Sequence, residues 1–170
     1  MKTINGKSTR VRLLAGVLAF GFFASGLLAL AGQASAADMS IIEKRKDTMK
    51  KVVLKNFKVV KEFVKDGKGS AADVAKAADA LVAVAAKIPA LFPKGTGRPD
   101  VDAKTTRALP KIWEDWAGFE AAAKALGAEA AKLSMVAAKG GKDAIAAQFG
   151  ATGKKGCGGC HKPFRGKKVE

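Results

Sequence analysis

Both cysteines and the only histidine of this 170-residue chain stand together near the C-terminus, as Cys157-Gly-Gly-Cys160-His161. Thiols and imidazole at this spacing can form a disulfide, bind zinc or attach a haem group covalently. The compartment decides among these chemistries, because thiols oxidise outside the cytoplasm and stay reduced inside it. The first forty residues indicate the compartment.

The N-terminal region has the order of a secretory signal peptide. Four basic residues and no acid precede an apolar run over 13–32, and the small residues Ala34-Ser35-Ala36 follow it. This order predicts export to the periplasm with cleavage after Ala36, so that 1–36 is the signal peptide. The apolar run is also long enough to span a bilayer, and an uncleaved membrane anchor is therefore the alternative.

The mature chain, 37–170, is long enough for one domain with a single core. Loss of the four N-terminal basic residues lowers its formal net charge from +16 to +12. This excess predicts attraction to acidic partner proteins and carries no information on the fold. Nucleic acid is not a predicted partner, because an exported chain without a compact Lys/Arg block beside aromatic residues lacks the usual features of such a surface.

Apolar residues recur every three or four positions in four segments, which is the pattern of amphipathic helices. The segments are 39–66, 70–88, 116–136 and 142–165. Ser70 and Asp73 resemble a capping box, Asp115 is a predicted N-cap, and 90–107 is the one long connection. Without any alternating strand pattern, these segments predict an all-α, antiparallel four-helix bundle with the cysteine motif on its C-terminal helix.

The last segment is a poor helix by propensity. It contains five glycines between 150 and 159, each of which costs on the order of 0.5–1 kcal/mol relative to alanine in a helix interior. Pro163 predicts that the helix kinks or ends soon after His161. Something other than propensity must therefore hold this helix, and small residues would let a flat macrocycle lie close to the backbone.

Covalent haem attachment explains the motif better than the other two chemistries. A catalytic disulfide of this spacing belongs at a strand-to-helix junction, and zinc would lack its third and fourth soft ligands. In haem attachment the cysteines form thioethers with the two vinyl groups, and the adjacent histidine binds iron. On a helix, Cys157 and His161 share one face, so the anchors can converge on one porphyrin.

Beyond this motif, the chain resembles the class II c-type cytochromes, which comprise cytochrome c′ and its low-spin His/Met relatives. The resemblance rests on Arg45-x-x-x-Met49, the LFPKGT loop at 91–96, the LPKIW turn at 109–113 and the C-terminal motif followed by Arg165. It covers essentially all of the mature chain.

The resemblance implies a role for each of these positions. Cys157 and Cys160 would carry one haem c, and His161 would be the proximal iron ligand. Arg45 and Arg165 would lie near the haem, where guanidinium groups suit the propionates. Met49 would face the sixth coordination position, either as a ligand or as a distal residue.

Two functions follow from the two states of Met49. If its sulfur binds iron, the Met/His ligation suits electron transfer. A monohaem electron carrier with acidic redox partners is the function that we expect in either ligation state. If it only packs over the iron, a five-coordinate haem is open to nitric oxide or carbon monoxide, which is the alternative. An enzyme is not predicted, since no catalytic constellation is present. The resemblance also permits a homodimer through the first two helices.

Overall fold

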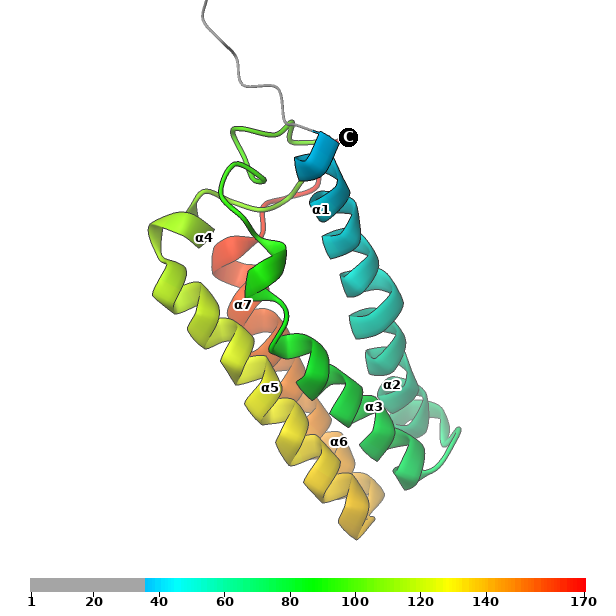
Figure 1. Ribbon diagram of the computed structural model, residues 1–170. Coiled ribbons are helices and arrows are strands. Elements are labelled where there is room, and N and C mark those ends of the chain that lie inside the picture. Colours follow the sequence, from blue (N-terminus) through cyan, green and yellow to red (C-terminus); the bar gives the residue numbers. More distant parts are fainter. Residues whose placement is uncertain (1–35) are drawn as a thin grey trace, which may run out of the picture. The chain divides into compact units, whose positions relative to one another are not determined.

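The computed structural model describes residues 36–170, which form four long helical segments packed side by side with alternating direction (Figure 1). The segments are α1 (Ala36–Asp47), η1 (Thr48–Leu54) and α2 (Lys55–Asp66); α3 (Ala71–Ala85); α5 (Trp116–Lys139); and α6 (Lys142–Ala151), η3 (Thr152–Cys157) and α7 (Gly158–Phe164). Within 36–170 no strand forms, and a single isolated bridge pairs Ala108 with Arg165. The predicted four-helix bundle is confirmed.

Local signals in the sequence place most of the helix ends. Gly67 ends α2 in the left-handed conformation, with φ of 66°. Ser70 and Asp73 form the predicted capping box, in which the Asp73 amide donates to Ser70 Oγ over 3.2 Å and the Ser70 amide donates to Asp73 Oδ2 over 3.0 Å. At the start of α5, Asp115 Oδ1 accepts a hydrogen bond of 3.1 Å from the Gly118 amide, as predicted.

The second helix ends earlier than the sequence predicts. α3 stops at Ala85, and Pro89 begins the short 3₁₀-helix η2 (Pro89–Leu91) in place of closing a helix that runs to Ile88. Proline suits the first turn of a helix because its missing N–H would have no partner there. The chain then follows an irregular path to the short helix α4 (Lys111–Glu114), so the predicted long connection is present.

Two segments of the long helices are π-helical, which the sequence pattern did not predict. η1 interrupts the first helix and contains Met49, and η3 interrupts the last helix and ends at Cys157. A π-helix bonds i to i+5, so its wider turn suits apolar residues that repeat at intervals of four, as Met49, Val53 and Phe57 do. Such segments are rare and often lie at functional sites. Both adjoin the residues predicted to bind haem.

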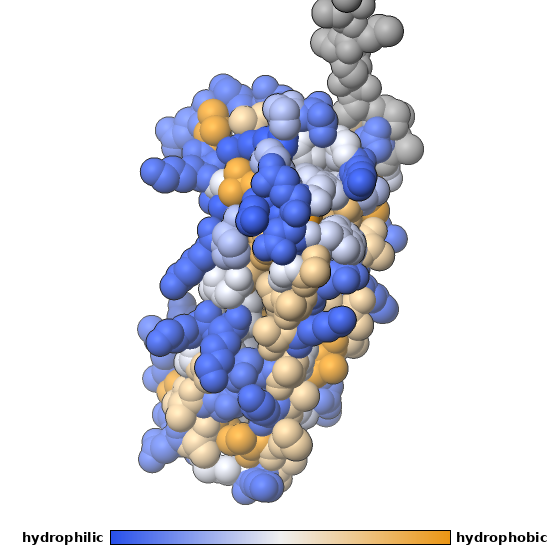
Figure 2. Space-filling model, turned by 90° about the vertical axis from the view of Figure 1, so that its left-hand side faces the viewer, coloured by the Kyte–Doolittle hydropathy of each residue, from blue (hydrophilic) through white to orange (hydrophobic). Residues whose placement is uncertain are grey.

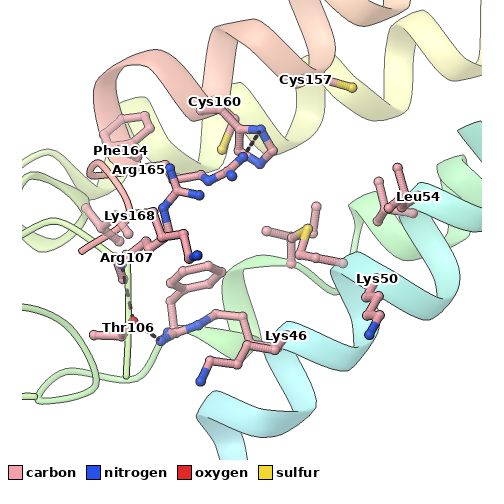
Figure 3. A pocket seen from close by; sticks show the side chains of 18 of the residues that line it. Lys46, Lys50, Leu54, Thr106, Arg107, Cys157, Cys160, Phe164, Arg165 and Lys168 are labelled. Carbon is pink, nitrogen blue, oxygen red and sulfur yellow. Dashed lines mark hydrogen bonds between the residues drawn. The ribbon is translucent and has the colours of Figure 1, made fainter. Parts of the chain in front are cut away.

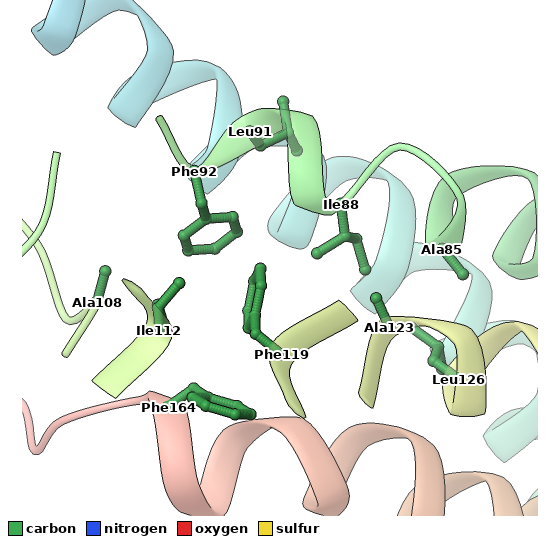
Figure 4. Packing of buried hydrophobic residues seen from close by; sticks show 10 residues of the cluster. All are labelled: Ala85, Ile88, Leu91, Phe92, Ala108, Ile112, Phe119, Ala123, Leu126 and Phe164. Atoms are coloured by element: carbon green, nitrogen blue, oxygen red, sulfur yellow. The ribbon is translucent and has the colours of Figure 1, made fainter. Parts of the chain in front are cut away.

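The core has two clusters at opposite ends of the bundle. The far-end cluster lies where α2 meets α3 and α5 meets α6 (Figure 1), and it consists of Val60, Val74, Ala77, Ala78, Leu133, Ala137 and Ile145. The pocket-end cluster lies around η2, α4 and α7, and Figure 4 shows its ten residues: Ala85, Ile88, Leu91, Phe92, Ala108, Ile112, Phe119, Ala123, Leu126 and Phe164.

Hydrophilic residues cover much of the face shown in Figure 2, including the end of the bundle that carries the connection between η2 and α4. Small and apolar residues form a band along the rest of that face. None of the helices within 36–170 is both long and apolar enough to cross a membrane. The predicted signal peptide, 1–36, lies outside the described residues apart from Ala36, and its cleavage stays a prediction.

Candidate functional site

A cavity of about 780 Å³ lies at the pocket end, between the first and last helical segments (Figure 3). Its wall on the C-terminal side carries Cys157, Cys160 and His161. The facing wall comes from α1, η1 and α2, and the pocket-end cluster closes the inner side. All six residues that the sequence predicts for a haem site line this one cavity: Arg45, Met49, Cys157, Cys160, His161 and Arg165.

The two thiols are free and half-buried. Burial raises the pKa of Cys157, and burial together with the nearby charge of Cys157 raises the pKa of Cys160 to about 11. A thiol with so high a pKa gives little thiolate at neutral pH, which does not favour a catalytic disulfide. Within 36–170, no group of three or more His, Cys, Asp and Glu side chains is placed to hold a metal ion.

The last helix lies very close to α5 just before the cysteine motif. A β-carbon built on Gly156 would lie 2.9 Å from Leu126 Cδ1 and 3.1 Å from Leu126 Cα. Any larger residue would push η3 away from α5, so glycine is required at this position. The close contact with Leu126 therefore explains why glycine stands at position 156, and this explanation does not depend on a cofactor.

A buried polar cluster also fastens η3 to α5. Glu129 is only 6 % exposed, and its carboxylate accepts hydrogen bonds from Gln148 Nε2 over 2.8 Å and from Lys132 Nζ over 3.0 Å. The Thr152 hydroxyl donates to the Glu129 carbonyl over 3.2 Å. The bonds from Lys132 and Gln148 lower the pKa of Glu129, so the carboxylate is ionised at neutral pH. The sequence pattern did not single out Glu129. Its one signal in the sequence was an acidic residue between Leu126 and Leu133 on an apolar stripe.

The end of α7 is tied to the long connection. The helix stops at Phe164, one residue after Pro163, as predicted. The Phe164 ring packs edge-on against Phe119 with centroids 5.3 Å apart, and its carbonyl accepts a 3.1 Å hydrogen bond from the Leu109 amide. The position of His161 is therefore fixed by the connection as well as by the helix.

Arg45 is buried and holds the long connection against α1. Its guanidinium donates to the Thr96 carbonyl over 2.9 Å and to Thr106 Oγ1 over 2.8 Å, and it lies 4.4 Å from the centre of the Phe92 ring. A further contact of 3.4 Å reaches the Leu91 carbonyl. Burial lowers the pKa of Arg45 to about 10, so the group stays charged at neutral pH. Within 36–170 this buried cation has no carboxylate partner.

Arg165 lies one turn after His161, and its Nη1 is 3.2 Å from His161 Nδ1. A guanidinium can only donate, so Nδ1 accepts in this contact and the neutral ring carries its proton on Nε2. Burial lowers the pKa of His161, and the charges of Arg165 and Arg107 lower it further. A neutral imidazole is the form that binds metals.

The sequence and the fold of the chain both have counterparts in known proteins. The family described as Cytochrome C′ matches residues 40–165. A cytochrome c′ from Rhodopseudomonas palustris (strain ATCC BAA-98 / CGA009) is 34% identical over 149 residues, which cover 85% of this chain and 94% of the relative.

Two solved structures share the fold. A cytochrome c′ described as having an unusual ligand-controlled dimer dissociation has a TM-score of 0.66 and 28% identity, and the match covers 79% of this chain and 100% of that one. A nitric oxide complex of a variant of cytochrome c prime from Alcaligenes xylosoxidans has a TM-score of 0.64 and 27% identity, with 76% and 97% covered.

Proposed function

Because the chain belongs to the cytochrome c′ family, whose proteins carry covalently attached haem c, we propose that it binds nitric oxide or carbon monoxide at haem iron held in this cavity. The observation that carries the proposal is the apolar wall of Met49, Val53 and Phe57 on the side facing the cysteine motif. Neutral diatomic gases lose little when they leave water for such a wall, whereas anions lose much. The nitric oxide complex of the relative supports the same function.

Cys157 and Cys160 would form the thioethers, and His161 would bind iron. Three observations support this assignment. The cavity volume falls within the range of about 300–1,000 Å³ that cofactor sites occupy. Both thiols are free and line the same cavity as His161. Arg45 is a buried cation without a carboxylate partner in the described residues, and a propionate would supply the missing negative charge.

The contact between Arg165 and His161 has a consequence for iron binding. If haem iron were bound by the Nε2 of His161, the proton that this nitrogen carries would have to move to Nδ1. Nδ1 would then be a donor and could no longer accept from Arg165. We therefore expect haem binding to release the Arg165 guanidinium, which can then reach an anionic group such as a propionate.

When bound, the haem supplies the iron to which the gas binds, and the chain controls access to it. Met49 is half-buried and packs against the pocket-end cluster. We propose that it covers the iron without binding to it, so that a gas must displace only a flexible thioether. The sequence left open whether Met49 binds iron and favoured an electron carrier over gas binding; the related nitric oxide complex gives better support to the open site.

A carbon monoxide titration of the ferrous holoprotein tests this function, with Met49→Ala as the variant and Met135→Ala as the matched control. Met135 is 59 % exposed and does not line the cavity. We expect the parent protein and Met135→Ala to bind the gas equally and Met49→Ala to bind it faster, because less side chain obstructs the iron. If only Met49→Ala binds carbon monoxide, Met49 is an iron ligand and gas binding is not the function.

Electron transfer is the second candidate. The mouth of the cavity carries several lysines and arginines, and a positive surface attracts acidic redox proteins. This candidate is compatible with a haem that also binds gas, because ferric iron must be reduced before it can bind carbon monoxide. The same titration identifies a haem that serves electron transfer alone, since a six-coordinate electron carrier would not respond to the gas. No enzymatic activity is proposed.

We propose two further properties of the chain. Export to the periplasm rests on the sequence pattern of 1–36. A homodimer is proposed because a related structure is described by its dimer dissociation, and because Val52 and Leu54 expose apolar surface on η1. Sedimentation of the holoprotein with and without carbon monoxide would test the dimer, and a monomer under both conditions would contradict it.

A further inference from the structure

The cavity opens through a ring of basic side chains. Among the described residues that line it, seven are lysine or arginine and none is acidic. Five of these form what we call the basic rim: Lys46, Lys50, Lys104, Arg107 and Lys168. They come from three separate parts of the chain, the first helix, the long connection and the C-terminal tail, and Figure 3 shows four of them on opposite sides of the opening.

No ion pair among the described residues balances the rim charges. Ion pairs within 36–170 involve Lys51, Lys58, Lys111, Lys132 and Lys155, and no member of the rim takes part in them. All four rim lysines are exposed, and Arg107 is half-buried with its Nε donating to the Gly166 carbonyl. The rim therefore presents uncompensated positive charge to solvent.

A bound haem would not neutralise the rim. Its two propionates could offset two of the seven lining cations, and Arg165 is the lining cation in contact with His161. Even if both propionates paired with members of the rim, three of its five cations would remain unpaired. Charges of one sign around a concave opening focus the potential and raise the association rate of an oppositely charged partner.

We propose that the basic rim is the docking surface for an acidic electron-transfer protein that reduces the haem iron. This rests on the proposed function, because only ferrous iron binds carbon monoxide. One electron passes from the reduced partner to ferric iron, which leaves ferrous iron and the oxidised partner, and no proton or bond is exchanged. Carboxylates on the partner would pair with the rim lysines and bring its redox centre to the mouth of the cavity.

The arrangement favours a protein over an anionic membrane. Membrane-surface helices place basic residues beside a broad apolar face that enters the lipid. Here the cations surround a concave opening and come from three segments, so a flat lipid surface would meet few of them together, whereas a projecting protein surface could meet most of them.

The test compares two double variants with the same loss of charge. Lys46→Gln/Lys50→Gln changes two rim lysines four residues apart, and Lys61→Gln/Lys65→Gln changes two exposed lysines at the same spacing on α2, outside the cavity. Reduction of each ferric holoprotein by a plant-type [2Fe–2S] ferredoxin, an acidic one-electron donor, is followed by stopped flow over a range of salt concentrations. Retention on immobilised polyglutamate measures binding without any electron transfer.

We expect the rim variant to be reduced about three- to tenfold more slowly than the control variant at low salt, to show a weaker salt dependence and to elute earlier from polyglutamate. Equal behaviour of the two variants would overturn the proposal, because net charge alone would then explain the attraction. Sedimentation with anionic phosphatidylserine vesicles is measured on the same variants. If the rim variant no longer sediments with the vesicles but is reduced at an unchanged rate, the docking proposal is overturned and the rim is assigned to a membrane. Carbon monoxide binding is measured on the same samples, so failure of the gas site is detected separately.

Discussion

The two ends of the bundle are built from similar alanine-rich helices, yet only one end is completed by its own side chains. At the far end, Val60, Leu133 and Ile145 are fully buried. At the pocket end, Met49, Cys157 and Cys160 are only partly buried and border a cavity of about 780 Å³. Protein interiors are normally close-packed, so the pocket end is the part of the fold that needs another component.

The backbone differs in the same way. The far-end cluster is built on regular α-helix, whereas both π-helical segments, η1 and η3, border the cavity. Each wider turn sits beside a residue predicted to act on the haem, Met49 in η1 and Cys157 at the end of η3. Regular packing is thus the property of the far end, and the proposed haem site is the property of the pocket end. Changes at one end should therefore affect different observables from changes at the other.

The largest effect is expected when both anchors are removed. Cys157→Ala/Cys160→Ala should abolish covalent haem, which the intact mass of the protein would report. Without the haem, amide exchange should accelerate around η3, α7 and the long connection, while α2 and the middle of α3 keep their protection, because the far-end cluster is complete. Covalent haem retained by this double variant would contradict the assignment of the anchors.

A substitution in the far-end cluster should lower the stability of the fold and leave the haem site unchanged. Leu133→Ala should lower the free energy of unfolding by about 2–5 kcal/mol, since a fully buried leucine leaves a cavity. The absorption spectrum of the haem should stay unchanged. Denaturant unfolding and visible spectra of one sample measure both properties, and a shifted spectrum would show that the two ends are coupled.

The sequence predicts the far end better than the pocket end. Periodicity and the caps at Ser70 and Asp115 are local signals, and they placed the helices within a few residues. The cysteine motif together with the family resemblance selected six residues that do line one cavity. Sequence spacing alone could not place Arg45 against the carbonyl of Thr96, since this contact crosses 51 positions and depends on the path of an irregular connection.

The π-helical segments and Glu129 were missed for related reasons. An α-helical period tolerates apolar residues at intervals of four, so the pattern around Val53 did not distinguish the wider turn. Glu129 is an acid on an apolar stripe, and its partner Gln148 lies on the next helix. Lys132, which compensates its charge, lies three residues further along α5, whereas the hydrogen bond from Gln148 is revealed only by the packing of α5 on α6.

Gly156→Ala should have an intermediate effect. The added methyl group would lie 2.9 Å from Leu126 Cδ1, so η3 must move, at a cost of about 1–3 kcal/mol. Gly150→Ala on the same helix is the control, because nothing lies within 4 Å of its new methyl group. The control should gain about 0.5–1 kcal/mol from helix propensity. Thermal unfolding of both variants measures the difference, and equal stabilities would argue against close packing at Gly156.

The smallest effect concerns pH. The hydrogen bonds from Lys132 and Gln148 lower the pKa of Glu129 below its ordinary value of 4.5, so ionised Glu129 stabilises the fold. This contribution is fully present above the ordinary pKa and is lost as the pH falls through the lowered one. Glu129→Gln should therefore lower the melting temperature near pH 7, and the difference from the parent should shrink below about pH 4. A constant difference across this range would mean that the charge of Glu129 does not matter.

The most direct test of the open gas site is the absorption spectrum of the ferrous holoprotein before any gas is added. We expect a five-coordinate, high-spin spectrum that is the same in Met49→Ala. A low-spin spectrum that becomes high-spin in Met49→Ala would show that the methionine sulfur binds the iron. That result would contradict the open site and make electron transfer the function.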